Sequence, residues 1–483
     1  MKKDVKGITI KKSENFSEWY SQIIEKAEIL DVRDNIKGFS VIRPWGAMIM
    51  ENMFSLYEEA LQKRGHLPTF FPTLISEKNL MKESEHVKGF SPEVFWIEKI
   101  KNEDRLALRP TSETMFTPMF ALWIRGHKEL PMKLYQRGSV FRLDTKATRP
   151  LIRSREIIWI EAHDAFSTKK EAEAQVQDDI KTTEEVMHQK FGVPFLAMKR
   201  PEWDKFAGAE YTIGSDVLMP DGKLIQQPST HLLGQKFSKA FNAKFLDENE
   251  KENYIWTTAY GPAISRILAS IISIHGDDKG LVLPFAISPI QAVIVPIYKK
   301  ENKSKVLKEA ENIKNKIESL NVKVKIDNRE QYSPGYKFNE WELKGVPLRI
   351  EIGEKEIESK KLTISIRDKE KREVVSVKDM QKIEAIGKNF DASLRKKADK
   401  SLDGKIENCK NISEIRKTLD SGKIARVNFC STSKEGVNCA EKVEKTTMGE
   451  IRGTLADKKE ASKGKCVICN KDSKEVVYIG RSY

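Results

Sequence analysis

Residues 133–166, KLYQRGSVFRLDTKATRPLIRSREIIWIEAHDAF, constrain the fold more than any other stretch of the chain. They predict two strands joined by a basic loop. Because successive side chains of a strand point to opposite faces, the second strand places Trp159, Glu161 and His163 on one face and only apolar side chains on the other. One face can carry chemistry while the other packs in a core. By itself, such a face more often forms a hydrogen-bonded structural network than a site.

The loop between these strands concentrates positive charge. Lys146, Arg149, Arg153 and Arg155 lie in it, and Arg142 ends the first strand. A basic loop is usually only solvated. A planar guanidinium can, however, hold two phosphate oxygens at once, and an arginine held by a strand does so with little reorganisation. The pattern therefore favours a phosphate ligand.

Three further segments accompany this hairpin along the chain. They read LRPTSET at 108–114, QQPSTHLLG at 226–234 and YGPAISRILASIISIHGDDKGLVLP at 260–284. Together with the hairpin and with Pro72, which follows an apolar extended run, they resemble the prolyl-tRNA synthetases, a family of class II aminoacyl-tRNA synthetases. The resemblance covers nearly the whole chain, and five segments in the right order and spacing are far more specific than any one of them.

The resemblance implies a proline site. Thr111 and Glu113 align with the residues that receive the ammonium group of the amino acid, and a carboxylate is the expected partner of a secondary ammonium. The other side chains implied for this site are Arg142, Trp159, Glu161, His163 and His231.

The same resemblance implies an ATP site. Arg142 corresponds to the arginine that contacts the α-phosphate, while Arg153 and Arg266 hold the outer phosphates of a bent ATP. Gln226 and Ser229 align with further ATP contacts. Because the carboxylate of proline is already an anion, it attacks the α-phosphorus without a catalytic base. Arg142 and Arg266 then act, together with Mg²⁺, by positioning the reactants and stabilising charge.

A few positions depart from the family's patterns. Asp144 stands where glutamate is usual, Ala263 replaces a common second glycine, and the histidine segment reads PSTH instead of GTSH. None of these changes removes a phosphate-binding arginine. Only 92 residues separate His163 from Trp256, too few for the editing domain of the bacterial-type enzymes. The resemblance is therefore to the archaeal and eukaryotic type without that insertion.

At 483 residues the chain exceeds the size at which one hydrophobic core stops growing, so we expect several domains. The resemblance implies an α+β fold that starts with a class II catalytic core over residues 1–287, an antiparallel sheet flanked by helices. Apolar strands and an amphipathic helix over 303–320 predict an α/β domain over 288–390. Residues 391–483 are expected to form a small α+β C-terminal domain. In the core, helical periodicity covers residues 16–30, 48–64 and 169–191.

Cysteines occur only in the C-terminal region. Cys430 and Cys439 have eight residues between them, and Cys466 and Cys469 have two. Four thiolates in two pairs suit a tetrahedral Zn²⁺ site, although the looser spacing of the first pair leaves free thiols open. The resemblance adds that archaeal-type enzymes carry a zinc domain here, and four protein ligands make the zinc structural. Cys409 is left over.

Charge and the resemblance together indicate the partners. A formal charge of +14 is consistent with a polyanion as a binding partner, although a lysine-rich surface gives the same excess of positive charge. The resemblance implies tRNA(Pro) and L-proline as substrates, a homodimer with Pro72 near its interface, and anticodon bases read by Glu342 and Arg349. Without an apolar signal core or a membrane span, we expect a cytoplasmic protein with no membrane partner.

Two alternatives stay open. A binding or regulatory paralogue could keep the scaffold and lose the chemistry, but such relatives usually lose the phosphate-binding arginines, and this chain keeps Arg142, Arg153 and Arg266. A class II synthetase for threonine, serine or glycine is the other. The TSE loop and the WIEAH strand disfavour it, and a threonyl enzyme would be expected to offer zinc ligands in its core, where the chain has no cysteine.

Overall fold

A large sheet organises the computed structural model, which describes residues 7–33, 36–82, 94–143, 147–369 and 372–483. Within these residues eleven strands follow the order β19-β20-β22-β21-β8-β9-β10-β13-β7-β6-β3. The central strands are β8 (Leu196–Lys199), β9 (Tyr211–Leu218), β10 (Lys223–Gly234), β13 (Trp256–Gly261), β7 (Glu156–Phe166) and β6 (Met132–Phe141). Each pairs antiparallel with the next, and β3 (Leu67–Pro68) adds parallel to β6. The antiparallel sheet of a class II core is confirmed.

The predicted hairpin is formed by β6 and β7. Gln136 lies opposite Glu161 in the antiparallel register. Ile160 and Ala162 are buried in the largest hydrophobic cluster, so β7 has the two unlike faces predicted from its alternation. Asp144 and Lys146, in the loop, lie outside the described residues.

Helices pack on the apolar face of this sheet. The longer helices of the core are α1 (Phe16–Lys26), α2 (Pro44–Gln62), α5 (Glu113–Trp123), α6 (Lys169–Thr183) and α8 (Ile264–His275). The first ends at Lys26, four residues before the predicted end at residue 30, and the second begins four residues earlier than predicted, because proline is favoured in a first turn. The third predicted helix forms α6 and continues as a wider π-type turn to Lys190.

Short elements complete the core. They are α3 (Glu77–Leu80), α7 (Lys236–Phe241) and the antiparallel pairs β1 (Leu30–Asp31) with β2 (Val41–Ile42), β4 (Leu74–Ser76) with β5 (Leu106–Leu108), and β11 (Lys244–Leu246) with β12 (Glu252–Tyr254).

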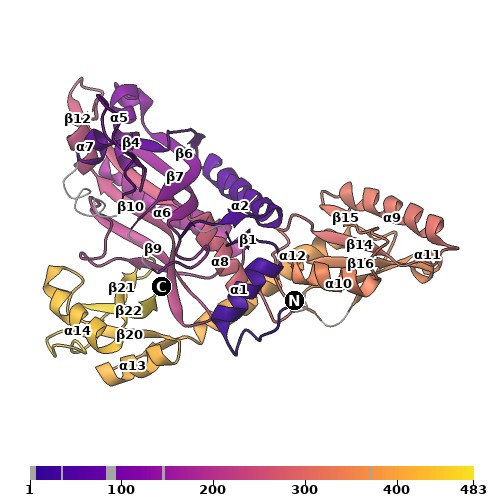
Figure 1. The fold of residues 1–483 in the computed structure, drawn as a ribbon. Helices are drawn as coiled ribbons and strands as arrows, with labels where there is room; N and C mark the ends of the chain where they lie inside the picture. Colours follow the sequence, from indigo (N-terminus) through magenta and orange to yellow (C-terminus); the bar gives the residue numbers. More distant parts are fainter. Residues whose placement is uncertain (1–6, 34–35, 83–93, 144–146, 370–371) are drawn as a thin grey trace.

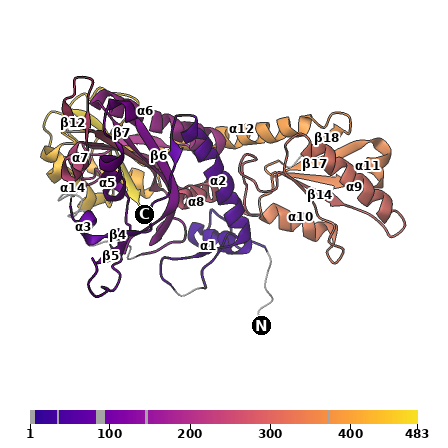
Figure 2. The ribbon, with the colours of Figure 1, turned by 90° about the horizontal axis from the view of Figure 1, so that it is seen from above.

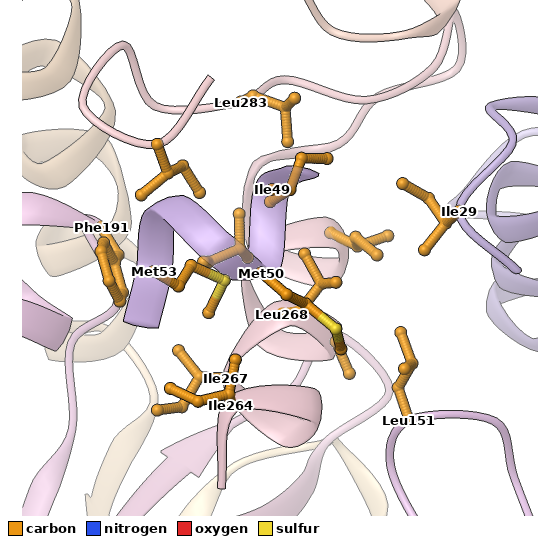
Figure 3. Close-up of a cluster of buried hydrophobic side chains, with 14 of the residues drawn as sticks. Ile29, Ile49, Met50, Met53, Leu151, Phe191, Ile264, Ile267, Leu268 and Leu283 are labelled. Carbon is orange, nitrogen blue, oxygen red and sulfur yellow. The ribbon is translucent and has the colours of Figure 1, made fainter. Parts of the chain in front are cut away.

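Helix α2 packs against α8, and this contact holds α8 in place beneath the large sheet. Figure 3 shows Ile49, Met50 and Met53 of α2 close to Ile264, Ile267 and Leu268 of α8. All six side chains are buried, and a buried side chain of this size is stabilised by about 1.5–3 kcal/mol relative to an exposed one. The first turn of α8, which carries Arg266, therefore has a fixed position beneath the sheet.

A second sheet lies at the far end of the molecule, away from the large one (Figures 1 and 2). Its strands follow the order β15-β14-β16-β17-β18. They are β14 (Ala292–Pro296), β15 (Val324–Ile326), β16 (Leu348–Ile352), β17 (Lys361–Ile366) and β18 (Glu373–Ser376), with helices α9 (Lys303–Glu318), α10 (Pro334–Leu343) and α11 (Glu354–Ser359). The first three are parallel to one another, whereas β17 and β18 pair antiparallel with their neighbours.

The chain then returns to the large sheet. Helix α12 (Lys382–Asp403) runs between the two ends of the molecule, as Figure 2 shows. The C-terminal elements are β19 (Ile406–Asn408), α13 (Ile412–Asp420), β20 (Ile424–Phe429), α14 (Val437–Thr447), β21 (Glu450–Leu455) and β22 (Glu475–Ser482). Because β21 pairs with β8, the C-terminal α+β region extends the catalytic sheet. The boundaries at 287 and 390 stay a prediction, and α12 spans the second.

Among the described residues, no helix is both long enough and apolar enough to cross a membrane.

Candidate active site

One cleft on the polar face of the large sheet brings together most of the predicted site residues. Its walls include Thr111, Glu113, Arg142, Trp159, Glu161, His163, Gln226, Ser229, His231 and Arg266. An adjoining cavity contains Arg153 and shares Arg142, Gln226 and Arg266 with the cleft. All the side chains predicted to hold proline and ATP therefore line one or both of two neighbouring cavities, which share some of their lining residues.

At one end of the cleft, Glu161 is held by three partners. Ser112 Oγ donates to Oε1 at 2.5 Å, Gln136 Nε2 donates to the same oxygen at 2.7 Å, and His163 Nε2 lies 3.0 Å from Oε2. Burial alone would raise the pKa of Glu161, but the hydrogen bonds and the charge of His163 hold this pKa below its ordinary value. Glu161 and His163 thus form a buried ion pair with fixed geometry.

Glu113 faces the same end of the cleft from the first turn of α5. Thr111 Oγ1 donates to its Oε2 at 2.5 Å. Burial raises the pKa of Glu113, and the nearby charge of Glu161 acts in the same direction, while His163 opposes it. A ligand with an ammonium group would stabilise the carboxylate form. This end of the cleft is therefore complementary to a small cation.

Arg109, which sequence analysis missed, supports Glu161 through Gln136. Its Nε donates to the carbonyl of Ser139 at 3.0 Å, and its Nη1 donates to Gln136 Oε1 at 3.1 Å. Gly138 leaves room for this guanidinium, because a Cβ there would collide with Nη2. Arg109 thereby orients Gln136, which in turn holds Glu161.

His231 is neutral at the pH of a cell. Burial lowers its pKa to about 3, and the positive charges of His163, Arg142 and Arg200 act in the same direction. Both ring nitrogens have hydroxyl partners, Thr212 Oγ1 at 2.9 Å and Ser229 Oγ at 3.1 Å. His231 can therefore shape the cleft and share a hydrogen bond, but it adds no charge.

The other end of the cleft is strongly positive. Arg142, Arg153 and Arg266 line one cavity, and burial together with the charges of Arg142 and Arg153 lowers the pKa of Arg266 to about 10. The buried Nε of Arg266 has no hydrogen-bond partner within the described residues. An anion between these groups would relieve their repulsion and accept the unused hydrogen bonds.

Sequence analysis also missed several other residues that line the cleft. They are Asp204, Phe206, Thr212 and Gln227. Thr212 could have been found from the alternation of YTIGSDVL, which places Thr212, Gly214 and Asp216 on one face of a strand. Asp204 and Phe206 lie in an irregular segment without periodicity, so no local signal marked them.

Two predicted groups lie elsewhere. Glu342 and Arg349 line a separate cleft on the second sheet, together with Arg367 and Arg372. The four cysteines Cys430, Cys439, Cys466 and Cys469 have ligand atoms within 4.8 Å of one another in the C-terminal region. A tetrahedral zinc with sulfur at about 2.3 Å needs sulfur atoms about 3.8 Å apart, so the cluster fits this ion.

Comparisons with known proteins match this chain over nearly its whole length. Family models match for the tRNA synthetase class II core domain (G, H, P, S and T) at residues 95–275, an anticodon binding domain at 291–384, and the prolyl-tRNA synthetase C-terminal domain at 412–483. The proline–tRNA ligase of Thermofilum pendens is 47% identical and that of Methanopyrus kandleri 40% identical, covering 99% and 97% of this chain and 99% and 96% of theirs.

Solved structures give the same result. The Giardia lamblia prolyl-tRNA synthetase in complex with prolyl-adenylate superposes with a TM-score of 0.94 at 35% identity, covering 99% of this chain and 100% of that one. The Cryptosporidium parvum enzyme, complexed with halofuginone and AMPPNP, gives a TM-score of 0.90 at 35% identity with the same coverage. Relatives named as proline–tRNA ligases are similar to this chain over nearly its whole length, and solved prolyl-tRNA synthetases share its fold. The chain therefore belongs to the prolyl-tRNA synthetase family of class II aminoacyl-tRNA synthetases.

Proposed function

We propose that this chain ligates L-proline to tRNA(Pro) in two ATP-dependent steps, through a prolyl-adenylate and transfer to the 3′-terminal adenosine. The observation that carries the proposal is the continuity of one cleft, in which Glu113 faces one end and Arg266 the other. An aminoacyl-adenylate needs this combination, because it joins an ammonium group to a phosphate. The Giardia lamblia relative, described with prolyl-adenylate, supports the same reading.

The carboxylate end recognises the amino acid. Glu113, fixed by Thr111, is the acceptor for the secondary ammonium of proline, and the Glu161–His163 pair closes the pocket beneath the ring. Phe116 stacks on His163 with ring centroids 4.2 Å apart, which keeps the imidazole from turning. Trp159 lines the cleft, and its buried Nε1 has no partner within the described residues, so we propose that a ligand accepts from it.

The arginine end performs the chemistry by binding charge. Arg142, whose Nε donates to the carbonyl of Pro110 at 3.3 Å, contacts the α-phosphate, where negative charge develops as the carboxylate of proline attacks. Arg153 and Arg266 hold the outer phosphates and so orient pyrophosphate as the leaving group. Gln226 and Ser229 complete the nucleotide site. No proton is removed from the nucleophile, so no side chain has to act as a base.

Mg²⁺ would accompany the nucleotide. Within the described residues, the only group of three or more potential metal-ligating side chains is the cysteine cluster, so we propose that phosphate oxygens and water hold the magnesium. When bound, it neutralises pyrophosphate. The arginines at the outer end of the cleft would bind the phosphates, and the ion would supply further positive charge beside them.

The first prediction tests adenylate formation with two arginines of one loop. Purified protein should exchange labelled pyrophosphate into ATP when proline is present, and Arg153→Gln should raise the KM for ATP at least about tenfold, as expected for a lost charge-assisted contact. Arg149→Gln is the matched control. Arg149 packs over the rings of Phe16 and Tyr20, so this change should leave the KM for ATP near the parent value.

Threonine, cysteine and alanine serve as comparison substrates in the same assay. Exchange that depends on threonine would favour a synthetase for another amino acid. No exchange with any amino acid would favour a binding paralogue and contradict the proposed function.

We also propose that Glu342 and Arg349 read anticodon bases. Arg349 lies over the ring of Phe338 at 4.0 Å and donates to Glu351 and Ser365, so its guanidinium is held in one orientation. Glu342 pairs with Lys279 at 3.2 Å at the rim of the same cleft. Unstacked bases need such fixed donors and acceptors along their edges.

The second prediction separates anticodon binding from adenylate formation. Arg349→Gln should raise the KM for tRNA about tenfold in aminoacylation, because a base contact is lost, and should leave pyrophosphate exchange without tRNA unchanged. Arg395→Gln, on α12 outside that cleft, should change neither value. An equal loss in both assays for Arg349→Gln would rule out a specific role in anticodon reading.

The cysteine cluster is proposed to hold a structural Zn²⁺. Burial raises the pKa of the Cys439 thiol, and a metal ion is what makes four adjacent thiolates stable there. Cys430 after β20, Cys439 of α14, and Cys466 and Cys469 before β22 would hold the ion, and four protein ligands would make its role structural.

The third prediction follows from this geometry. The protein should contain about one zinc per chain, and Cys466→Ser should remove the metal and lower the temperature of thermal unfolding, because metal binding contributes folding free energy. Cys409→Ser is the control, since Cys409 lies outside the cluster beside Thr418. Equal zinc content in the two variants would show that the cluster is not the metal site.

A homodimer is proposed from an apolar patch formed by Leu67, Phe70, Leu122 and Trp123. Phe70 is 89% exposed, and the other three are more than two-fifths exposed. The rings of Phe71 and Trp123 lie 6.2 Å apart, which brings the two segments together. Exposed apolar side chains that lie together favour a protein contact, and a second copy of the chain around a twofold axis would cover them.

The fourth prediction is a mass. In sedimentation equilibrium the protein should have twice the 55.3 kDa of one chain, and Phe70→Asp should halve this mass, because a buried unpaired charge opposes association. Val374→Asp, which alters an exposed valine of β18, should leave it unchanged. A monomeric parent protein would contradict the proposal.

The proposed location is the cytoplasm, where the thiols stay reduced and tRNA is charged.

A further inference from the structure

One arginine of the C-terminal region lies against the catalytic sheet. Arg452 lies on β21, and the next residues of that strand pair antiparallel with Lys199 and Met198 of β8. Its side chain is almost fully buried, and it lines the cavity that also contains Arg142, Arg153 and Arg266. A residue more than 180 positions after the nearest of these arginines therefore borders the nucleotide end of the cleft.

Arg452 shares the carboxylate of Asp216 with a second arginine. Arg200 donates to Asp216 Oδ2 from Nη1 at 2.7 Å and to Oδ1 from Nη2 at 2.6 Å. Arg452 donates to Oδ2 from Nε at 2.9 Å and to Oδ1 from Nη2 at 3.1 Å. Each oxygen thus accepts two charged hydrogen bonds, so the carboxylate cannot turn. Burial acts to raise the pKa of Asp216, but the two guanidinium charges hold it well below its ordinary value.

The network continues to the nucleotide site through Arg200. Its Nη2 also donates to Gln226 Oε1 at 2.9 Å, and its Nη1 donates to the carbonyl of Arg452 at 2.8 Å. Gly214 makes room for this guanidinium, because a Cβ there would collide with Nη2. The carbonyl of Gln226 accepts from Arg266 Nη1 at 3.4 Å. Asp216 and its two arginines therefore hold the side chain of Gln226 in place. The backbone of the same residue contacts Arg266.

We propose that Arg452 is a positioning residue for the nucleotide end of the cleft, which it orders through Asp216, Arg200 and Gln226. The inference rests on the proposed function and extends it, because it makes the C-terminal region part of the ATP site. Without the guanidinium of Arg452, two of the four bonds to Asp216 are lost. Its carboxylate can then turn, and Arg200 can follow it away from Gln226.

The same geometry explains why the chain should fold without this guanidinium. Asp216 keeps both bonds from Arg200, so no buried charge is left unpaired. The proline end is held by a separate set of contacts, those of Glu161 with Ser112 and Gln136. The loss should therefore appear in ATP binding and leave recognition of proline intact.

The fifth prediction tests this split with Arg452→Gln in the full-length protein. In proline-dependent pyrophosphate exchange, the KM for ATP should rise about tenfold while the KM for proline stays within about twofold. Arg426→Gln is the matched control, because Arg426 pairs with Glu460 and Asn408 inside the C-terminal region. It should leave both constants unchanged. Arg452→Lys, which keeps the charge and one donor direction, should recover part of the ATP affinity.

A double-mutant cycle with Gln226→Ala separates positioning from direct contact. If Arg452 acts through Gln226, the double variant should have a KM for ATP no higher than that of Gln226→Ala alone. Additive effects would mean that Arg452 contacts the nucleotide itself and would overturn the positioning role. Equal increases in the KM for ATP and for proline, with a lower unfolding temperature, would reduce Arg452 to a structural residue.

Failure of this inference is distinguishable from failure of the proposed function. If the parent protein shows no proline-dependent exchange, the function itself is wrong. If the parent protein is active and Arg452→Gln has its KM for ATP, only the role of Arg452 is refuted.

Discussion

The repulsion among Arg142, Arg153 and Arg266 is the interaction on which the rest of the site depends. Three half-buried guanidinium groups in one place oppose folding, and burial, followed by the charges of Arg142 and Arg153, lowers the pKa of Arg266. They are tolerated because each is held in or next to a regular element: Arg142 directly follows β6, Arg153 shortly precedes β7, and Arg266 lies in the first turn of α8. A triphosphate would convert this repulsion into attraction without any movement of the frame, which is the preorganisation that phosphoryl transfer requires.

The division of the large sheet into two faces makes this arrangement possible. The apolar side chains of β7 pack with α8 and α2 in the core, as Figure 3 shows for the two helices, while the alternate side chains face the cleft. Glu161 and His163 are therefore held by the same strand that anchors the core. The polar supports Arg109 and Asp216 act from behind the cleft at either end. The site is rigid because its supports are themselves buried and paired.

Much of this could be predicted from the sequence, for identifiable reasons. The alternation of WIEAH fixed which side chains share a face, and the order of the motif-like segments placed Glu113, His231 and Arg266 around one space. Arg109 and Arg452 were missed because local patterns carry no information about their partners: Arg452 and Asp216 are 236 residues apart. The start of α2 was misplaced for a different reason, because Pro44 extends the helix through a local first-turn preference that hydrophobic periodicity does not detect. The anticodon and zinc residues remain predictions.

A crystal structure with a non-hydrolysable prolyl-adenylate analogue tests the central claim most directly. The account predicts that the secondary amine of the analogue lies within hydrogen-bonding distance of Glu113, that the group replacing the α-phosphate contacts Arg142, and that pyrophosphate added to the crystal binds between Arg153 and Arg266. An analogue bound with its amine directed toward the three arginines, or bound outside the cleft, would contradict it.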